Sequence, residues 1–205
     1  MKVRTEARRQ AIVEAAAGLF QEMGYEGASM NELAKRLGGS KATLYGYFPT
    51  KEALFIAVVQ SFATGHLSEA AEALSEEVVG RAALEAALTR FGERMLQVLT
   101  NDATALAVYR MVVAESGRSE VGQLFHEAGP RQSIAALTAL LSAAMKRGEL
   151  RRADPKVTAL QFTALVTAET GLRLYQRDPP PLAPAQIRQM VRRAVEMFIA
   201  GTVAR

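Results

Sequence analysis

Residues 29–51, SMNELAKRLGGSKATLYGYFPTK, constrain the fold of this chain more than any other stretch. Ser29 is a favourable N-cap in front of an apolar-periodic segment, so a helix is predicted to begin there. The glycine pair that starts at Gly38 ends this helix, because glycine adopts the left-handed backbone that a C-cap needs. Ser40 caps a second helix, and Pro49 prevents its continuation. A helix, a glycine turn and a second helix are together typical of a helix-turn-helix.

The second of these helices, residues 41–48, has two faces of different kinds. Leu44 and Phe48 share one face and are predicted to pack inward. The other positions carry hydroxyl or ammonium groups, which donate to phosphate oxygens, or are small enough to approach a major groove closely. The alternative is an ordinary surface helix whose tyrosines cover a core while their hydroxyls stay in water. The spacing alone leaves both interpretations open.

The order of motifs from Thr5 to Phe55 resembles the DNA-binding domain of the TetR/AcrR family of bacterial transcriptional regulators. The matching pieces are AAAGLF, MGYEGASM, NELAKRLG and SKATLYGYFPTKEALF, and Gly39 departs from the apolar residue that the family usually has there. The resemblance implies that helix 41–48 enters the major groove. It implies phosphate contacts from Thr43, Tyr47 and Lys51, with Lys41, Ala42 and Gly46 nearest the bases. The full predicted DNA-binding set is Ser29, Ser40, Lys41, Ala42, Thr43, Tyr45, Gly46, Tyr47 and Lys51.

Composition sets the class of protein. Of the 205 residues, 49% are hydrophobic and 22% are charged, which is ordinary for a globular protein. Cysteine is absent, which excludes disulfides and thiolate zinc sites and fits a reducing cytoplasm. No signal peptide is expected, and no apolar run approaches the roughly 20 residues that a membrane span needs. We therefore expect a cytoplasmic protein without a membrane segment.

Positive charge gathers near the beginning of the chain. Residues 1–51 hold eight basic and five acidic side chains, a net charge of +3 out of +4 for the whole chain. The earliest basic residues are Lys2, Arg4, Arg8 and Arg9. They are either an arm that reaches the DNA backbone or a solvated tail.

The remainder of the chain is predicted to be helical, with no strand signal and no internal repeat. The expected fold is all-α, with about nine helices. Residues 1–50 form a three-helix DNA-binding domain with the helix-turn-helix, and residues 51–205 form a helical bundle for effector binding and dimerisation. Predicted helices outside the motif include approximately 5–23, 51–75, 119–146, 155–175 and 184–202.

The second half of the chain resembles the C-terminal region of AefR-like members of the same family. The similarity lies in YRMVVAESGRSEVGQLFHEAGP, MKRGELRRADP and QFTALV. It implies an effector cavity, although side chains of these types usually just fill a core. The predicted cavity residues are Phe62, Phe91, Met95, Tyr109, Arg110, Phe125 and Phe162.

The last two helices are the expected dimer contact, in a four-helix bundle with the same pair of a second chain. The alternative is a monomer in which they fold onto their own core. Glu169 and Arg173 are spaced for an ion pair on one helix. The predicted interface residues are Leu165, Glu169, Leu172, Ile187, Val191, Val195 and Phe198.

These patterns predict a homodimeric repressor that binds a palindromic double-stranded DNA operator and is released by a small apolar or amphipathic effector. The alternative is a ligand-independent helical DNA-binding protein with a filled C-terminal core. An enzyme is not expected, because the chain has no GxSxG, P-loop or GxGxxG motif. No cofactor or metal is expected either, since His66 and His126 lie in no metal-ligand spacing.

Overall fold

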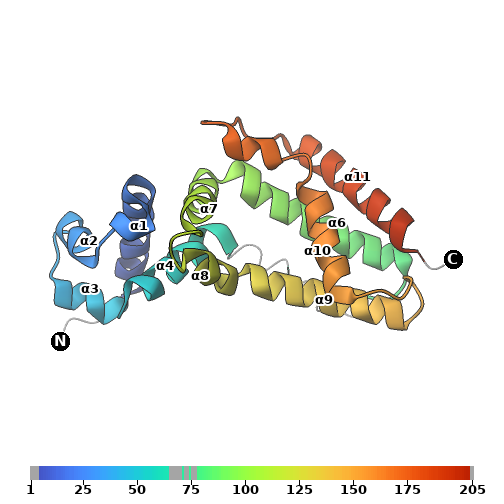
Figure 1. Ribbon diagram of the computed structural model, residues 1–205, viewed down its shortest axis with the longest axis horizontal. Coiled ribbons are helices and arrows are strands. Elements are labelled where there is room, and N and C mark those ends of the chain that lie inside the picture. The colour runs from blue at the N-terminus through green and yellow to red at the C-terminus, as the bar shows by residue number, and fades with distance from the viewer. Residues whose placement is uncertain (1–4, 65–70, 72–73, 75–77, 204–205) are drawn as a thin grey trace. The chain divides into compact units, whose positions relative to one another are not determined.

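The computed structural model describes residues 5–64, 71, 74 and 78–203, which form helices and short connections (Figure 1). The α-helices within this part are α1 (Glu6–Gly27), α2 (Met30–Arg36), α3 (Lys41–Tyr47), α4 (Lys51–Val59), α6 (Arg81–Asn101), α7 (Ala103–Glu115), α8 (Val121–Ala128), α9 (Pro130–Lys146), α10 (Pro155–Thr167) and α11 (Pro184–Thr202). Two shorter helices are the π-helix η1 (Gln60–Thr64) and the 3₁₀-helix η3 (Gly171–Tyr175). The predicted all-α fold is confirmed. None of the described helices combines the length and apolar character that crossing a bilayer requires.

The chain divides into two compact units. Unit 1 comprises residues 1–65 and 104–129, and unit 2 comprises residues 66–103 and 130–205. The helices α2 and α3, of the predicted helix-turn-helix, thus share a unit with α4, α7 and α8. The predicted functional division at residue 50 stays a prediction.

The core of unit 1 surrounds an aromatic cluster. The ring of Phe55 lies edge-on to Phe20 and Tyr25, with ring centroids 5.6 and 5.1 Å apart. All three residues are buried, and α4 packs against both α1 and α8. Because α4 is apolar on most of its surface, it can be covered from several sides. The helix α4 therefore connects the N-terminal helices of unit 1 with α8.

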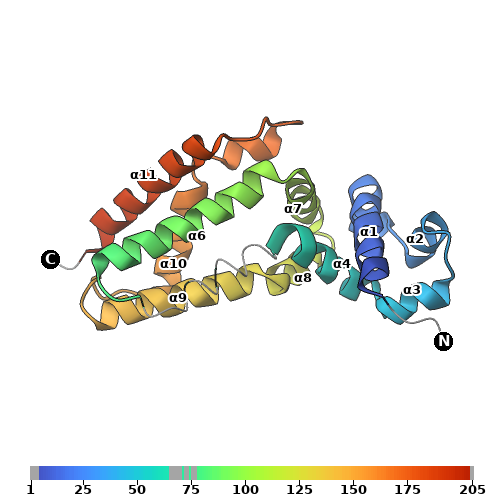
Figure 2. The ribbon, with the colours of Figure 1, turned by 180° about the vertical axis from the view of Figure 1, so that it is seen from behind.

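Unit 2 is a bundle in which α11 packs on α6 and α10, and α10 packs on α9. Figure 2 shows α11 lying along α6. Asp154 begins α10 as predicted, because its carboxylate accepts the N–H groups of Lys156 and Val157 at 2.8 and 2.9 Å. Proline follows at the first helical position, where no N–H is needed.

The predicted helix 119–146 is wrong, because two helices occupy this stretch. Gly129 leaves the helical conformation, with φ −173° and ψ −50°, and α9 begins at Pro130. The residue before a proline is sterically excluded from the helical region, so the chain breaks here instead of continuing. This break accounts for ten described α-helices where about nine were expected.

The predicted helix 155–175 is also too long, since α10 ends at Thr167. The hydroxyl of Thr170 donates to the carbonyl of Thr167 at 3.0 Å, which competes with helical pairing at this end. The predicted pair of Glu169 with Arg173 is therefore wrong, because the two are not on one continuous α-helix. Glu169 instead accepts Arg193 Nε of α11 at 2.9 Å.

The helix ends in unit 1 differ less from expectation. Gly24 interrupts α1 as predicted, with φ +72°, but one more turn follows to Gly27. The regular part of α4 ends at Val59 and continues as η1. Most of the predicted remainder, towards residue 75, lies outside the described residues.

Candidate nucleic-acid interface

α2 and α3 form the helix-turn-helix, and side-chain oxygens fix where each helix begins. Ser29 Oγ accepts the N–H of Glu32 at 3.2 Å, and Ser40 Oγ accepts the N–H of Thr43 at 3.1 Å. Both predicted N-caps are confirmed. Gly38 has a φ of +59°, the conformation that ends a helix with a tight change of direction. The turn is thus determined by two caps and one glycine.

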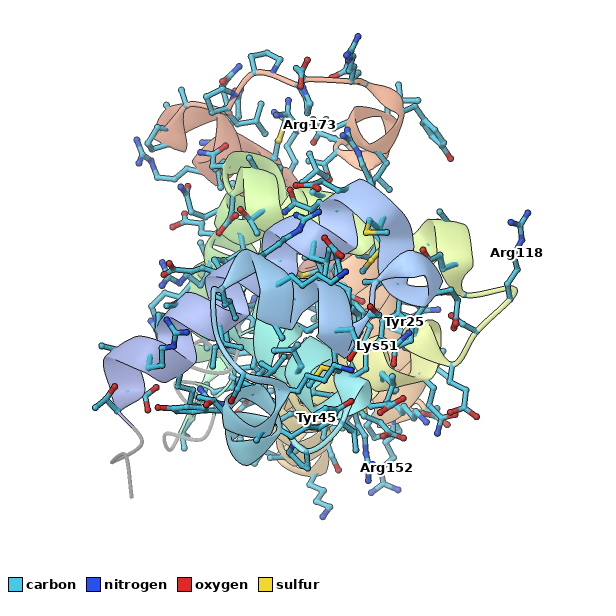
Figure 3. All side chains as sticks on the ribbon, turned by 90° about the vertical axis from the view of Figure 1, so that its left-hand side faces the viewer. Tyr25, Tyr45, Lys51, Arg118, Arg152 and Arg173 are labelled. Carbon is cyan, nitrogen blue, oxygen red and sulfur yellow. The ribbon has the colours of Figure 1, made fainter. Side chains whose placement is uncertain are left out.

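One side of α3 is buried and the other faces out. Leu44 and Phe48 are buried, as predicted. Figure 3 shows Tyr45 at the surface of α3, where 46% of the residue is exposed. The remaining predicted contact residues of α3 are outward or half-buried: Lys41, Ala42 and Thr43 are exposed, and Gly46 and Tyr47 are half-buried.

The hydroxyls on α3 form hydrogen bonds within the protein, but the Tyr47 hydroxyl still has a hydrogen to donate. Tyr47 Oη accepts the N–H of Thr5 at 3.1 Å. Since this bond uses a lone pair, the phenolic hydrogen of Tyr47 remains available to a phosphate oxygen. Thr43 Oγ1 lies 2.9 Å from Ser40 Oγ, so these two hydroxyls share one hydrogen bond.

Lys51, at the start of α4, is held against the C-terminal end of α1. Its Nζ donates to the carbonyls of Tyr25 at 3.0 Å and Ala28 at 3.5 Å, and lies 4.3 Å from the centre of the Tyr25 ring. Figure 3 shows Lys51 beside Tyr25. An ammonium group has three donors, so two carbonyls leave one for a phosphate. The predicted phosphate contact is chemically compatible with this position.

Two arginines of α1 lie against the turn and α3. Arg8 Nη2 donates to the carbonyl of Leu37 at 3.4 Å, and the guanidinium of Arg9 stands 5.2 Å from the centre of the Phe48 ring. A Cβ at Gly39 would stand 3.3 Å from Arg8 Nη2. The glycine that departs from the family pattern therefore leaves room for Arg8. Lys2 and Arg4 lie outside the described residues.

The basic residues of α2 and α3 differ in whether an acidic side chain pairs with them. Arg36 Nη2 lies 2.7 Å from Glu22 Oε2, and this hydrogen bond lowers the pKa of Glu22 below its usual value. Lys41 forms no ion pair within the part of the chain that the structure describes. Lys41 is thus the more available of the two for a polyanion.

Two family models match the chain along most of its length. The model described as bacterial regulatory proteins, tetR family, matches residues 12–58, and that of the AefR-like transcriptional repressor C-terminal domain matches residues 86–201. The first contains the helix-turn-helix, and the second by itself covers more than half of the chain. This chain belongs to the TetR family of transcriptional regulators. Both predicted resemblances are confirmed.

Individual relatives of this TetR-family chain are also transcriptional regulators. The transcriptional activator FasR of Mycolicibacterium smegmatis is 38% identical over 86 residues, which are 42% of this chain and 39% of FasR. The regulator RutR of Escherichia coli is 43% identical over 54 residues, 26% of each chain. The matched part thus spans less than half of either relative. These relatives are transcriptional regulators, and this chain is a regulator rather than an enzyme.

Solved structures extend the similarity to the whole chain. The flavonoid-responsive regulator FrrA is 31% identical, with a TM-score of 0.70, over 98% of this chain and 100% of that one. A TetR-family regulator from Mesorhizobium loti is 26% identical, with a TM-score of 0.75 and the same coverage.

The residues predicted for the effector cavity are distributed over both units of this TetR-family regulator. In unit 1 the rings of Tyr109 and Phe125 lie 5.8 Å apart. In unit 2 Phe91 and Phe162 are buried, and Phe162 packs edge-on to Phe198 at 5.1 Å. The assignment of all seven to a cavity stays a prediction. The other members of the set are Phe62 and Arg110 in unit 1 and Met95 in unit 2.

The predicted dimer residues separate into buried and exposed groups. The α11 members belong to the core of unit 2: Ile187, Val191, Val195 and Phe198. Leu165 is half-buried, whereas Glu169 and Leu172 are exposed. The outward apolar side chains of α10 and α11 are instead Val157, Leu160 and Met197. A shallow groove of about 440 Å³ lies between these helices, lined in part by Leu165 and Met197.

Two residues outside the predicted DNA-binding set support it. Thr5 donates to Tyr47, and the Glu115 carboxylate accepts the N–H groups of Tyr25 and Glu26. These contacts join residues 42 and about 90 positions apart. No short motif signals such pairs. In the sequence, Gly24 is a local signal for a bend in the chain. The structure confirms a positive φ at Gly24, beside Glu115.

Proposed function

We propose that this regulator is a homodimeric repressor that binds a palindromic operator and leaves it when a small apolar or amphipathic effector binds. The observation that carries the proposal is the outward face of α3, with Lys41, Thr43 and Tyr45 exposed and Tyr47 half-buried on a helix capped at Ser40. Hydroxyl and ammonium donors on one helix face suit a phosphate backbone, and small side chains suit the floor of a major groove.

In this proposal Thr43, Tyr47 and Lys51 hold phosphates. Lys41, Ala42, Tyr45 and Gly46 lie nearest the base edges, while Ser29 and Ser40 present the first turns of α2 and α3 to the backbone. Phosphate contacts fix the register of the protein on DNA, and base contacts select the sequence. Since its target is the bacterial chromosome, we place the protein in the cytoplasm.

The outward side of α10 and α11 supports the proposed dimer. Val157 and Leu160 are each 48% exposed, and Met197 is 64% exposed. A second copy that covers these side chains removes apolar surface from water, which favours association. A two-fold pair then presents two α3 helices to half-sites roughly 34–36 Å apart, or a multiple of that distance.

The effector part of the proposal is supported by the relatives. FrrA, which is similar over the whole length, is named flavonoid-responsive. An effector releases DNA only if it binds better to the conformer that does not fit the operator. Tyr109 and Phe125 offer aromatic surface and Arg110 offers a cation, a combination suited to an amphipathic molecule. The burial of Phe91 and Phe162 favours the alternative, a ligand-independent regulator with a filled core.

The decisive experiment is fluorescence anisotropy with a duplex from the DNA upstream of the chain's own gene and a scrambled duplex of equal composition. We expect a preference for the upstream duplex, and a loss of at least several-fold on combining Thr43→Ala with Tyr47→Phe. Thr138→Ala in unit 2 is the matched control, because among the described residues its hydroxyl bonds only the Ile134 carbonyl. Equal affinity for both duplexes, together with no enriched sequence from a random pool, would contradict sequence-specific binding.

Native mass spectrometry of the purified protein separates the two candidate functions. A retained small molecule whose addition lowers operator affinity supports the effector. If operator binding is intact, no molecule is retained and organic extracts of the host leave the affinity unchanged, the ligand-independent regulator is favoured.

A further inference from the structure

The carboxylate of Glu115, the last residue of α7, binds the backbone where α1 gives way to α2. Glu115 Oε1 and Oε2 accept the N–H of Tyr25 at 2.8 and 2.9 Å, and Oε2 also accepts the N–H of Glu26 at 3.2 Å. The extended conformation of Gly24 interrupts the helix, so these two N–H groups begin a new turn and lack helical partners. Glu115 therefore serves as an N-cap supplied by another helix.

Gly24 leaves the space that this carboxylate occupies. A Cβ at position 24 would stand 2.1 Å from Glu115 Oε1, closer than any real contact, and its φ of +72° also favours glycine. Two independent features of one glycine thus match the bound carboxylate. The backbone conformation at Gly24 and the absence of a Cβ there thus both accommodate the Glu115 carboxylate.

The same segment is held from α4 on its other side. Lys51 donates to the carbonyls of Tyr25 and Ala28 at 3.0 and 3.5 Å. Within residues 25–28, α7 therefore binds the N–H groups of Tyr25 and Glu26, and α4 binds the carbonyls of Tyr25 and Ala28. Ser29, which caps α2, follows directly. Whatever fixes residues 25–28 also fixes the start of the helix-turn-helix.

We propose that Glu115 is a positioning residue for DNA binding: by holding residues 25–28, it sets the placement of α2 and α3 from α7. The inference rests on the DNA-binding mode proposed above and adds a residue that touches no DNA. Hydrogen bonds of this kind span about 2.7–3.2 Å, so a displacement of α7 by roughly 1 Å would take these contacts out of hydrogen-bond range. Tyr109 and Arg110 lie on the same helix, so a ligand at these residues acts on the helix that carries Glu115.

The sign of the effect separates positioning from simple electrostatics. Glu115 is an anion, so its removal should strengthen binding to a polyanion if only net charge mattered. Positioning predicts the opposite, a weaker complex with an unchanged salt slope, because no phosphate contact is lost. Glu127 is the matched control: it belongs to the same unit, is exposed, and within the described part of the chain bonds only the side chain of Gln123 one turn away.

The test uses the full-length protein, a duplex enriched by the wild type from a random pool, and amide hydrogen exchange. In Glu115→Ala the amides of Tyr25 and Glu26 should exchange at least tenfold faster, and the dissociation constant for the enriched duplex should rise about tenfold. Glu115→Gln keeps one acceptor and should fall between this variant and the wild type. Glu127→Ala should leave the exchange unchanged and bind equally or more tightly. Circular dichroism checks that every variant remains helical.

Thermodynamic coupling gives a second test, in which the effect of DNA on amide exchange is measured. If the contact and DNA binding are coupled, the enriched duplex must slow exchange at Tyr25 and Glu26 in the wild type and have less effect in Glu115→Ala. Unchanged exchange in Glu115→Ala, or operator affinity equal to or above that of the wild type, would overturn the proposal. Failure to enrich any duplex would instead contradict the proposed function, while the exchange of the free proteins would still report on the Glu115 contact.

Discussion

The phenol oxygen of Tyr47 lies 3.1 Å from the backbone nitrogen of Thr5, which donates a hydrogen bond to it across 42 positions of the sequence. Thr5 is also the N-cap of α1, since its hydroxyl accepts the N–H of Arg8 at 3.3 Å. The Tyr47 hydroxyl therefore joins the last turn of α3 to the N-cap of α1. Because Tyr47 is the acceptor in this bond, its phenolic hydrogen can be donated to another group, which leads to the first prediction.

Tyr47→Phe should weaken binding to specific and non-specific DNA alike, by about 0.5–1.5 kcal/mol, because it removes one neutral hydrogen-bond donor. The salt dependence should stay the same, since no charge is lost. Anisotropy titrations at several salt concentrations measure both quantities. An unchanged affinity on every duplex would remove Tyr47 from the interface.

Lys51→Ala should act differently, because it removes a cation. We expect weaker binding to all sequences and a slope of log K against log salt reduced by about 1. The free energy of unfolding should also fall, since the carbonyls of Tyr25 and Ala28 lose their donor. A slope equal to that of the wild type would place Lys51 in a purely structural role.

The close approach of Gly24 to Glu115 can be tested by a double-mutant cycle. Gly24→Ala introduces both a strained φ and a clash with the carboxylate, whereas in the Glu115→Ala background only the strain remains. Gly24→Ala should therefore cost less stability in the Glu115→Ala background, with an interaction energy in the range of about 0.5–3 kcal/mol. Denaturant unfolding of the four proteins measures it. Strictly additive effects would mean that the carboxylate moves away without cost.

Most of the helix-turn-helix could be predicted from the sequence, because the residues that determine it act on their neighbours in the chain. Ser29, Gly38 and Ser40 act on their own neighbours, and the inward Leu44 follows from helical spacing alone. The contacts of Glu115 could not be predicted, since they depend on which distant backbone groups the fold leaves unpaired. The break at Gly129 was predictable in principle from the proline rule, but the apolar periodicity on both sides concealed it. The α11 residues predicted for the dimer belong to the core of unit 2, because an apolar stripe marks a buried face without saying what buries it; their role in a dimer stays a prediction.

Glu149 in unit 2 makes stability depend on pH. Its Oε1 accepts Arg147 Nε at 2.6 Å and the N–H of Gly80 at 2.9 Å, and these bonds hold the pKa of Glu149 below its usual value. A lowered pKa in the folded state means that the stabilisation is present above the unfolded pKa of about 4.3 and is lost as pH falls through the folded pKa. Glu149→Gln should be less stable than the wild type by about 1.5–3 kcal/mol at pH 7. Chemical unfolding from pH 7 to pH 3 should make the two curves converge; a constant difference would contradict the linkage.

The outward side chains of α10 and α11 give the last prediction, which concerns the dimer. Leu160→Lys combined with Met197→Lys should leave the fold of one chain intact, because both residues are largely exposed, at 48% and 64%. In a dimer that buries this face, two unpaired charges per chain would be desolvated, which is costly, so the protein should become monomeric at micromolar concentration. Val113→Lys is the matched control, since Val113 is 59% exposed on α7 in unit 1. Light scattering after size exclusion measures the mass, and operator affinity should fall with it, because a single α3 reads only one half-site. A dimer that persists in the double variant would place the interface on another surface.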